Sequence, residues 1–283
     1  TTSDEDDKGP SILGSVYGGG ENGHNYSDGN VTINKGTIGN AKESANAYDC
    51  GNVYGAGCGT DTYWVDADED GEKDDGEVHQ NPMAGLVRVN TTITVNGGNV
   101  LRNIYGAGSM GSVGNDTEAE SGKTTINING GTIGRTEDND HGHVFGGPKG
   151  DLAETEFKAS VKSTLVNINA HPSDATKVPI VWGSVFGGGE AGIIKGSVVV
   201  NMNGGTVKKD VYGGGALADT QTGNWDATAN SGAGDWADAE KKSALHTTTV
   251  RLTGGRVGEE VFGGGLGEAG KPAYVWGDVL VDL

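Results

Sequence analysis

One short motif recurs along the chain and constrains its fold more than any other sequence feature. A β-branched residue is followed by an aromatic residue and then by small residues, mostly glycine. The motif occurs seven times: Val16-Tyr17-Gly18-Gly19-Gly20, Val53-Tyr54-Gly55-Ala56-Gly57, Ile104-Tyr105-Gly106-Ala107-Gly108, Val144-Phe145-Gly146-Gly147-Pro148, Val185-Phe186-Gly187-Gly188-Gly189, Val211-Tyr212-Gly213-Gly214-Gly215 and Val261-Phe262-Gly263-Gly264-Gly265. Self-similarity of this kind is typical of folds in which one small unit stacks on the next.

A second element lies between consecutive motifs and alternates in polarity. In residues 198–203, Val198, Val200 and Met202 are expected to face the interior of a β-strand. A glycine turn follows, and another aliphatic residue stands five positions after the last inward one, which predicts a third short strand. The offset holds for Ile33 to Ile38, Val95 to Val100, Ile128 to Ile133, Met202 to Val207 and Leu252 to Val257.

These elements together predict an all-β fold, a parallel β-helix or β-solenoid of about seven coils with long loop insertions. The most compact copy runs 26 residues from Val185 to Val211, which suffices for three short strands and their turns. With 53 glycines and only 6% aromatic residues, the composition suits thin stacked layers. We expect residues 1–283 to form this single domain, with a polar linker at 1–10, as a fragment of a larger surface protein.

Two side-chain columns should follow from the stacking of copies. Asparagine recurs just before the glycine corners, where stacked amides can hydrogen-bond from one coil to the next. These residues are Asn34, Asn96, Asn129, Asn169 and Asn203. The aromatic residues of the seven motifs should likewise stack in register. A ligand-binding role for either column is the alternative to a structural one.

The charge balance limits the choice of partner. Asp and Glu total 39 against 20 Lys and Arg, for a net charge of −19, so a phosphate backbone would be repelled and nucleic acid is excluded as a partner. No apolar run is long enough to cross a bilayer in this fragment. A negative, glycine-rich surface of this kind is expected outside the cell. Cys50 and Cys58 bracket a segment that would need a bend before they could form a disulfide, and the sequence leaves their pairing open.

The copies differ in length from 26 to 51 residues, and the longest insertions span residues 58–90 and 216–246. Insertions at particular corners of a repeat protein often build its binding face. Three tryptophans, Trp64, Trp225 and Trp236, fall in these two loops and are the candidate ligand-binding residues, since exposed rings suit sugar stacking. The alternative is that the tryptophans fold back to cover the sides of the solenoid.

Residues 66–77 contain an acidic segment that resembles the calcium-binding loop of EF-hand and dockerin proteins. The resemblance implies a structural Ca²⁺ that orders the loop. The side chains of Asp66, Asp68 and Asp70 would bind the ion, and Gly71 would make the sharp turn. Glu72 would contribute its carbonyl, Asp74 a water-bridged contact and Glu77 a bidentate carboxylate. Lys73 departs from the pattern, because an aliphatic residue usually stands there, and no flanking helices are evident.

Catalytic signatures are weak. We find no nucleophile motif and no convincing pair of carboxylates with an adjoining base, so the chain is expected not to be an enzyme. His141 and His143 lie near Asp138 and Asp140 and form a weak candidate for a metal site, with simple solvation as the alternative.

The segments 14–20, 29–39 and 123–134 resemble the glycine-rich repeats of large secreted or surface proteins of gut Bacteroidetes. The resemblance covers nearly the whole chain. It implies a right-handed parallel β-helix on the bacterial cell surface, with an adhesin-like role and with neighbouring repeats of a parent chain as partners.

Three functions remain open at this point. The first is a surface-exposed adhesin-like module that binds glycans or other host or matrix ligands through its loops. The second is a β-helix polysaccharide lyase or glycoside hydrolase, supported mainly by analogy of fold, in which Lys73 or Arg88 would be the nearest candidate base. The third is a passive structural stalk.

Overall fold

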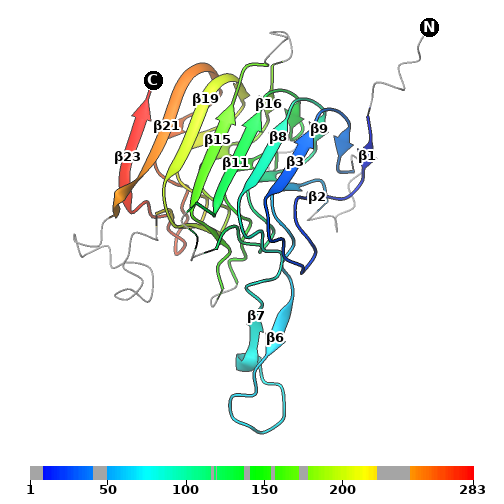
Figure 1. Ribbon diagram of the computed structural model, residues 1–283. Helices are drawn as coiled ribbons and strands as arrows, with labels where there is room; N and C mark the ends of the chain where they lie inside the picture. The colour runs from blue at the N-terminus through cyan, green and yellow to red at the C-terminus, as the bar shows by residue number, and fades with distance from the viewer. Residues whose placement is uncertain are drawn as a thin grey trace.

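The computed structural model describes residues 9–40, 50–115, 118, 120–136, 141–153, 157–171, 178–221 and 243–283. In this part of the chain all regular elements are strands except one 3-10 turn, η1 (Asp75–Glu77). Most strand pairs are parallel, and they build two large sheets, the larger of which is strongly curled (Figure 1). The prediction of an all-β fold with parallel pairing is therefore confirmed.

The seven aromatic motifs form one sheet of their own. Each copy contributes a two-residue strand, and the strands pair in parallel in the order of the sequence. They are β2 (Val16–Tyr17), β5 (Val53–Tyr54), β10 (Ile104–Tyr105), β13 (Val144–Phe145), β17 (Val185–Phe186), β20 (Val211–Tyr212) and β22 (Val261–Phe262). Each copy between the first and the last is thus hydrogen-bonded to the copy before it and the copy after it.

The alternating strands and the short strands after the glycine turns share a second, twelve-stranded sheet. The alternating strands are β3 (Gly29–Ile33), β8 (Thr91–Val95), β11 (Lys123–Ile128), β15 (Ser163–Ile168), β19 (Val198–Val207), β21 (Ser243–Val257) and β23 (Gly277–Asp282). The short strands are β1 (Ser11–Ile12), β4 (Thr37–Ile38), β9 (Asn99–Val100), β12 (Thr132–Ile133) and β16 (Ile180–Val181). Strand β19 pairs with both β15 and β16, so the two rows of strands are joined through it into one curled surface.

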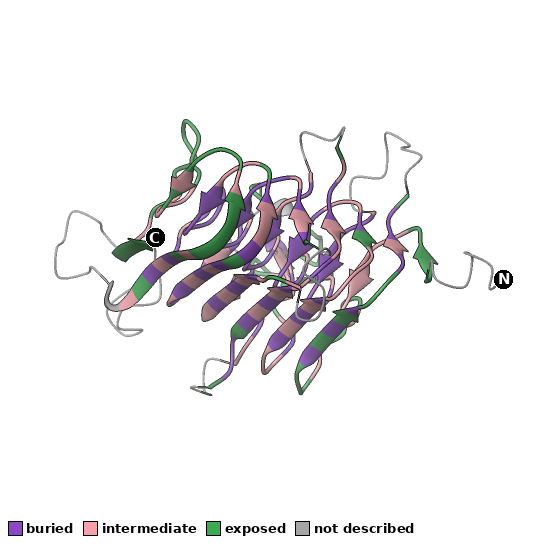
Figure 2. Ribbon diagram, turned by 90° about the horizontal axis from the view of Figure 1, so that it is seen from above, coloured by how far each residue is buried: buried purple, intermediate pink, exposed green. Residues whose placement is uncertain are grey.

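Alternation along the long strands decides what is buried. In β19 the residues Val198, Val200 and Met202 are buried, as predicted, while the residues between them are partly exposed. Figure 2 shows the same banding along the neighbouring strands. The buried side chains are mostly valine and isoleucine, and they pack against those of the seven-stranded sheet in one continuous core. Since strand side chains alternate between two faces, this pattern fixes the register of each copy on the next.

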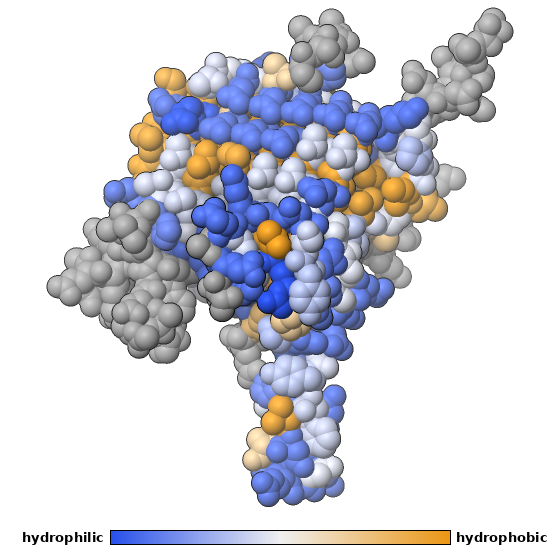
Figure 3. Space-filling model, in the orientation of Figure 1, coloured by the Kyte–Doolittle hydropathy of each residue, from blue (hydrophilic) through white to orange (hydrophobic). Residues whose placement is uncertain are grey.

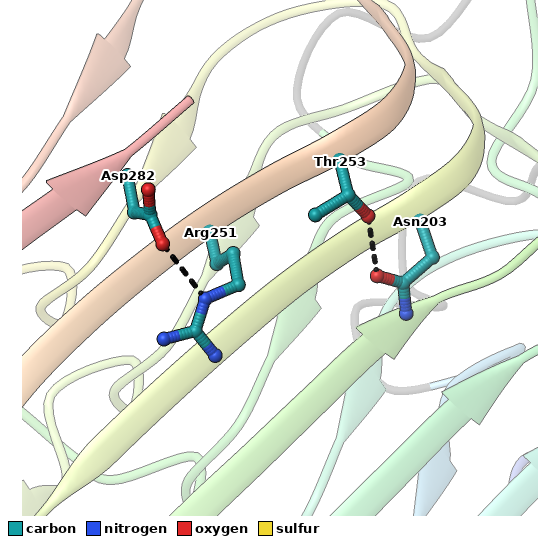
Figure 4. Close-up of polar contacts among 4 residues, drawn as sticks. All are labelled: Asn203, Arg251, Thr253 and Asp282. Carbon is teal, nitrogen blue, oxygen red and sulfur yellow. Dashed lines mark hydrogen bonds and ion pairs between the residues drawn. The ribbon is translucent and has the colours of Figure 1, made fainter.

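Both predicted side-chain columns are confirmed. The seven aromatic rings stack face to face, with centroids of neighbouring rings between 4.6 and 5.0 Å apart. Each asparagine of the ladder donates from Nδ2 to Oδ1 of the preceding one at 2.9 to 3.0 Å, and Thr253 continues the ladder by donating to Asn203 (Figure 4). A second ladder, Asn127, Asn167 and Asn201, was not predicted.

A third line of contacts between copies was also missed by the sequence analysis. It follows the aromatic motifs and consists of isolated bridges, of the short strands β14 (Ser160–Val161) and β18 (Ile193–Ile194), and of one hydrogen bond from Val113 N to Ser160 O. We call it the third contact line, and its residues are Asn25, Val87, Val113, Val161, Ile194, Thr220 and Val275. Four of them, Val87, Val113, Val161 and Ile194, belong to a separate small hydrophobic cluster.

Two further observations concern the loops and ends of the described chain. Cys50 and Cys58 are not joined by a disulfide. Across the described residues we find no helix with the length and apolar character that a bilayer span requires.

Candidate functional site

The first long insertion folds into a hairpin that projects away from the sheets (Figures 1 and 3). Strands β6 (Thr62–Trp64) and β7 (Val78–Gln80) pair antiparallel, with Trp64 opposite Val78. At its base the side-chain amide of Gln80 donates to the carbonyl oxygen of Gly59 at 2.8 Å. The insertion therefore leaves the body of the protein and returns to it at nearly the same place.

The tip of the hairpin is the acidic loop of residues 66–77. The amide of Gly71 donates to Asp66 Oδ2 at 3.1 Å, and the amide of Glu72 donates to Asp70 Oδ1 at 2.8 Å. Positive φ angles of 62° at Glu69 and 79° at Gly71 complete the turn, and glycine adopts such an angle at little cost. The loop is thus curled around its own carboxylates.

This curl brings three of the predicted calcium ligands together. One carboxylate oxygen each from Asp66, Asp68 and Asp70 lies within 4.8 Å of the others. Within the described residues Asp66 Oδ1 is buried and accepts no hydrogen bond. Three negative charges at this separation repel one another, and a hard cation with oxygen ligands would relieve that repulsion.

Glu77 is placed differently from the EF-hand expectation. The Asp66–Asp68–Asp70 group does not include it, and its oxygens accept hydrogen bonds from the hairpin itself. The Trp64 indole Nε1 donates to Oε2 at 2.9 Å, and the Ala67 amide donates to Oε1 at 2.6 Å. The bond from Trp64, followed by that from Ala67, lowers the pKa of Glu77 despite the opposing effect of burial. Glu77 therefore stays ionised and ties the loop to strand β6.

The remaining predicted ligands lie along the loop between these two groups. Glu72 and Asp74 are both exposed. The Asp74 amide donates to Glu77 Oε2 at 3.3 Å, so this residue also belongs to the network around Glu77. A carbonyl ligand from Glu72 and a water-bridged ligand from Asp74 remain predictions.

The end of strand β6 and the residue that follows it carry an exposed run of large apolar side chains. Tyr63 is 48% exposed, Trp64 42% and Val65 46%. Trp64 is therefore partly exposed, while its indole nitrogen is held by Glu77, and a role in ligand binding stays a prediction. The other two candidate ligand-binding residues, Trp225 and Trp236, lie outside the described residues.

The histidine pair is part of the scaffold. His143 Nδ1 accepts a hydrogen bond from the Ser184 amide at 2.9 Å, and the His143 amide donates to Asn103 Oδ1 at the same distance. His141 Nε2 lies 2.6 Å from Arg102 Nη1. Asp138 and Asp140, the acidic neighbours in the proposed metal site, lie outside the described residues.

A second acidic group was missed by the sequence analysis. Asp210, Glu259 and Glu260 come together beside the last two aromatic motifs. A hydrogen bond with Asp210 raises the pKa of Glu260, and burial together with Asp210 raises the pKa of Tyr212 to about 12. The sequence signal was an acidic residue directly before each of these two motifs, where the earlier copies carry serine, asparagine or histidine.

Comparison of the chain with protein-family models, with curated proteins and with solved structures finds no match.

Proposed function

We propose that the chain is a right-handed β-solenoid of about seven coils that serves as an adhesin-like module on a bacterial cell surface. The projecting hairpin is its ligand-contacting element. The observation that carries this proposal is the contrast between a regularly hydrogen-bonded stack and one long insertion that stands clear of it (Figure 1). A rigid scaffold that presents a variable loop is a common arrangement for binding.

The chemistry of the hairpin favours a saccharide as its ligand. Tyr63 and Trp64 expose aromatic rings beside acidic and amide side chains, a mixture that suits the apolar faces and hydroxyl groups of sugars. Exposed clusters of large apolar groups on soluble proteins commonly mark interaction sites. Host or matrix glycans are accordingly the proposed partners.

We propose that Ca²⁺ braces this hairpin. Asp66, Asp68 and Asp70 already face one another around a buried oxygen of Asp66 that accepts no hydrogen bond within the described chain. Glu77 joins the ion only by exchanging one of its present hydrogen bonds for coordination, because both of its oxygens are engaged. The role of the ion is structural, since it neutralises the repulsion that otherwise loosens the tip.

Replacing Asp68 by asparagine is expected to weaken Ca²⁺ binding at least about tenfold, because one of the clustered charges is removed without loss of volume. Titration calorimetry with Ca²⁺ measures the change. Protease cleavage within residues 66–77 should become faster in the variant and should no longer respond to Ca²⁺.

Glu259→Gln is the matched control, because it removes one carboxylate from the other acidic group, Asp210, Glu259 and Glu260. Unchanged Ca²⁺ binding in this variant is expected. Loss of binding in Glu259→Gln but not in Asp68→Asn would place the ion at the second group and contradict the proposal.

Replacing Trp64 by alanine is expected to abolish the binding of neutral saccharides on an array of host and dietary glycans, because it removes both the exposed ring and the brace to Glu77. Trp64→Phe separates these two effects, since it keeps a ring and loses only the indole hydrogen bond. Partial binding by Trp64→Phe is expected.

Trp182→Ala is the control for this experiment, because that ring lies against Lys208 on the body of the protein and not on the hairpin. If the wild-type chain binds no glycan on the array, the result favours a passive stalk. Release of unsaturated products from an acidic polysaccharide would instead make it a lyase.

A further inference from the structure

A groove of ≈ 590 Å³ lies at the foot of the hairpin, on the side of the protein formed by the third contact line. One wall comes from Pro82, Met83 and Leu86, where the chain returns from β7. Phe157 and Ile193 also line the groove, as do Ser112, Asn115 and Ser160. The groove therefore combines apolar surfaces with hydroxyl and amide groups.

The described lining of this groove is rich in basic residues, in contrast to the acidic composition of the chain. Arg88, Lys158, Lys162 and Lys195 line it, whereas none of its described lining residues is aspartate or glutamate. The chain as a whole has only 20 basic residues and a net charge of −19. A cluster of cations in a concave site attracts anions there even though the average surface repels them.

The stacking of copies positions three of these cations. Val87, Val161 and Ile194 of the third contact line point into the small hydrophobic cluster. Arg88, Lys162 and Lys195 each follow one of them directly, and all three are partly exposed. Because neighbouring residues of an extended chain face opposite sides, the three cations lie on the same side of the stack, with Gly114 at the matching position of the copy between Arg88 and Lys162.

Two of the cationic groups are held in place by neutral partners. Lys162 Nζ donates to the carbonyl oxygens of Asn115 at 2.7 Å and Glu118 at 2.5 Å, and neither of these oxygens carries a formal charge. The guanidinium carbon of Arg88 lies 5.1 Å from the centroid of the Tyr26 ring, and Tyr26 is 72% exposed. These two cations are thus pre-organised, which reduces the entropy lost when a ligand binds.

We propose that this groove binds an acidic oligosaccharide, whose sugar rings carry carboxylate or sulfate groups. The group of cations suits charges repeated along a chain, the serine and asparagine side chains suit hydroxyl groups, and the rings of Phe157 and Tyr26 suit the apolar faces of sugars.

The floor of the groove favours a saccharide over an extended acidic peptide. Strands β14 and β18 pair with each other, and the amides of Ile193 and Lys195 already donate to Ala159 and Val161. A peptide that adds to a sheet needs an edge with unpaired backbone groups. A saccharide needs only the side chains that line the groove.

The proposal concerns a site separate from the exposed ring of Trp64, and its test is independent of that ring. Calorimetry is carried out with an oligogalacturonate, a heparin-derived oligosaccharide, a neutral cello-oligosaccharide and poly-glutamate as probes. At least one acidic oligosaccharide should bind, with an affinity that falls as salt is raised. The neutral probe and poly-glutamate should bind at least about tenfold more weakly.

The double variant Arg88→Gln, Lys195→Gln should weaken this binding at least about tenfold, because it removes two charge-assisted contacts. The matched control is Arg256→Gln, Lys208→Gln, which removes the same charges from exposed positions along and just after the long strands of the twelve-stranded sheet. Thermal unfolding confirms that each variant is folded. Trp64→Phe should bind the acidic probes as the wild type does. The groove proposal and the hairpin proposal can therefore fail independently of each other.

Three results would overturn the proposal. In the first, neither acidic oligosaccharide binds. In the second, poly-glutamate binds as well as the oligosaccharides, which would mean that the groove recognises negative charge or a peptide and has no preference for a saccharide. In the third, both double variants lose binding equally, and the attraction is then diffuse. The choice between oligogalacturonate and the heparin fragment identifies the acidic group that the groove prefers.

Discussion

Gly106→Ala is expected to destabilise the protein by more than about 3 kcal/mol and to leave little folded chain at 37 °C. Gly106 is the first glycine of the third aromatic motif, and a Cβ built on it would collide with the carbonyl oxygen of Gly146 in the next copy. The Gly146 carbonyl carbon at 2.9 Å and Thr124 Cβ at 3.0 Å close the remaining space. Relief would require the copies to move apart, and the hydrogen bonds between β10 and β13 would then be strained.

Urea unfolding followed by circular dichroism measures this effect. Gly264→Ala is the control, because a methyl group added at this second glycine of the last motif has no atom within 4 Å. It should change the free energy of unfolding by less than about 1 kcal/mol. Equal losses in the two variants would mean that close approach between copies is not what requires glycine.

Phe145→Ala is expected to cost about 3–5 kcal/mol, because it leaves a cavity in the middle of the aromatic column. The ring is 3% exposed and lies between Tyr105 at 5.0 Å and Phe186 at 4.8 Å. Its loss removes both stacking contacts in addition to the buried apolar area. Chemical denaturation again gives the measurement.

Phe262→Ala is the comparison for this second prediction. That ring is 43% exposed and stacks only on Tyr212 among the described residues, so the expected cost is about 1 kcal/mol. A similar cost at both positions would contradict the view that the column stabilises each copy through its two neighbours.

The sequence predicted those parts of the fold that repeat at constant spacing. A local period or a fixed offset predicts the inward residues of β19, the stacked rings and the asparagine ladder, and the same pattern recurs from copy to copy. The second asparagine ladder could have been found in the same way, since Asn127, Asn167 and Asn201 occupy matching positions of three consecutive alternating strands.

The third contact line was harder to see because insertions interrupt it. Each copy contributes one residue to this line. That residue stands five positions after the last glycine of the motif in the copies that end at Gly20, Gly108, Gly189 and Gly215, but it stands much farther along the chain after Gly57. The group of cations beside it exists only once the copies are stacked. No sequence window contains Arg88, Lys162 and Lys195 together, so the groove could not be predicted without the fold.

The acidic loop was predicted in part. Spacing sufficed to place Asp66, Asp68 and Asp70 around a common point, because these residues alternate within one tight turn. Spacing could not predict the partners of Glu77, since the strand pairing of the hairpin places the Trp64 indole beside it. The tertiary contact with Trp64 thus competes with the role that the local motif suggests.

The closeness of the two ends of the hairpin has a consequence for how such a protein can diversify. Because Gly59 and Gln80 meet where the insertion leaves and rejoins the body, the segment between them can lengthen, shorten or be exchanged while the register of the layers above and below is kept. Selection for new recognition and selection for folding would then act on separate stretches of the chain, and a foreign loop grafted between these two residues would inherit a ready-made support.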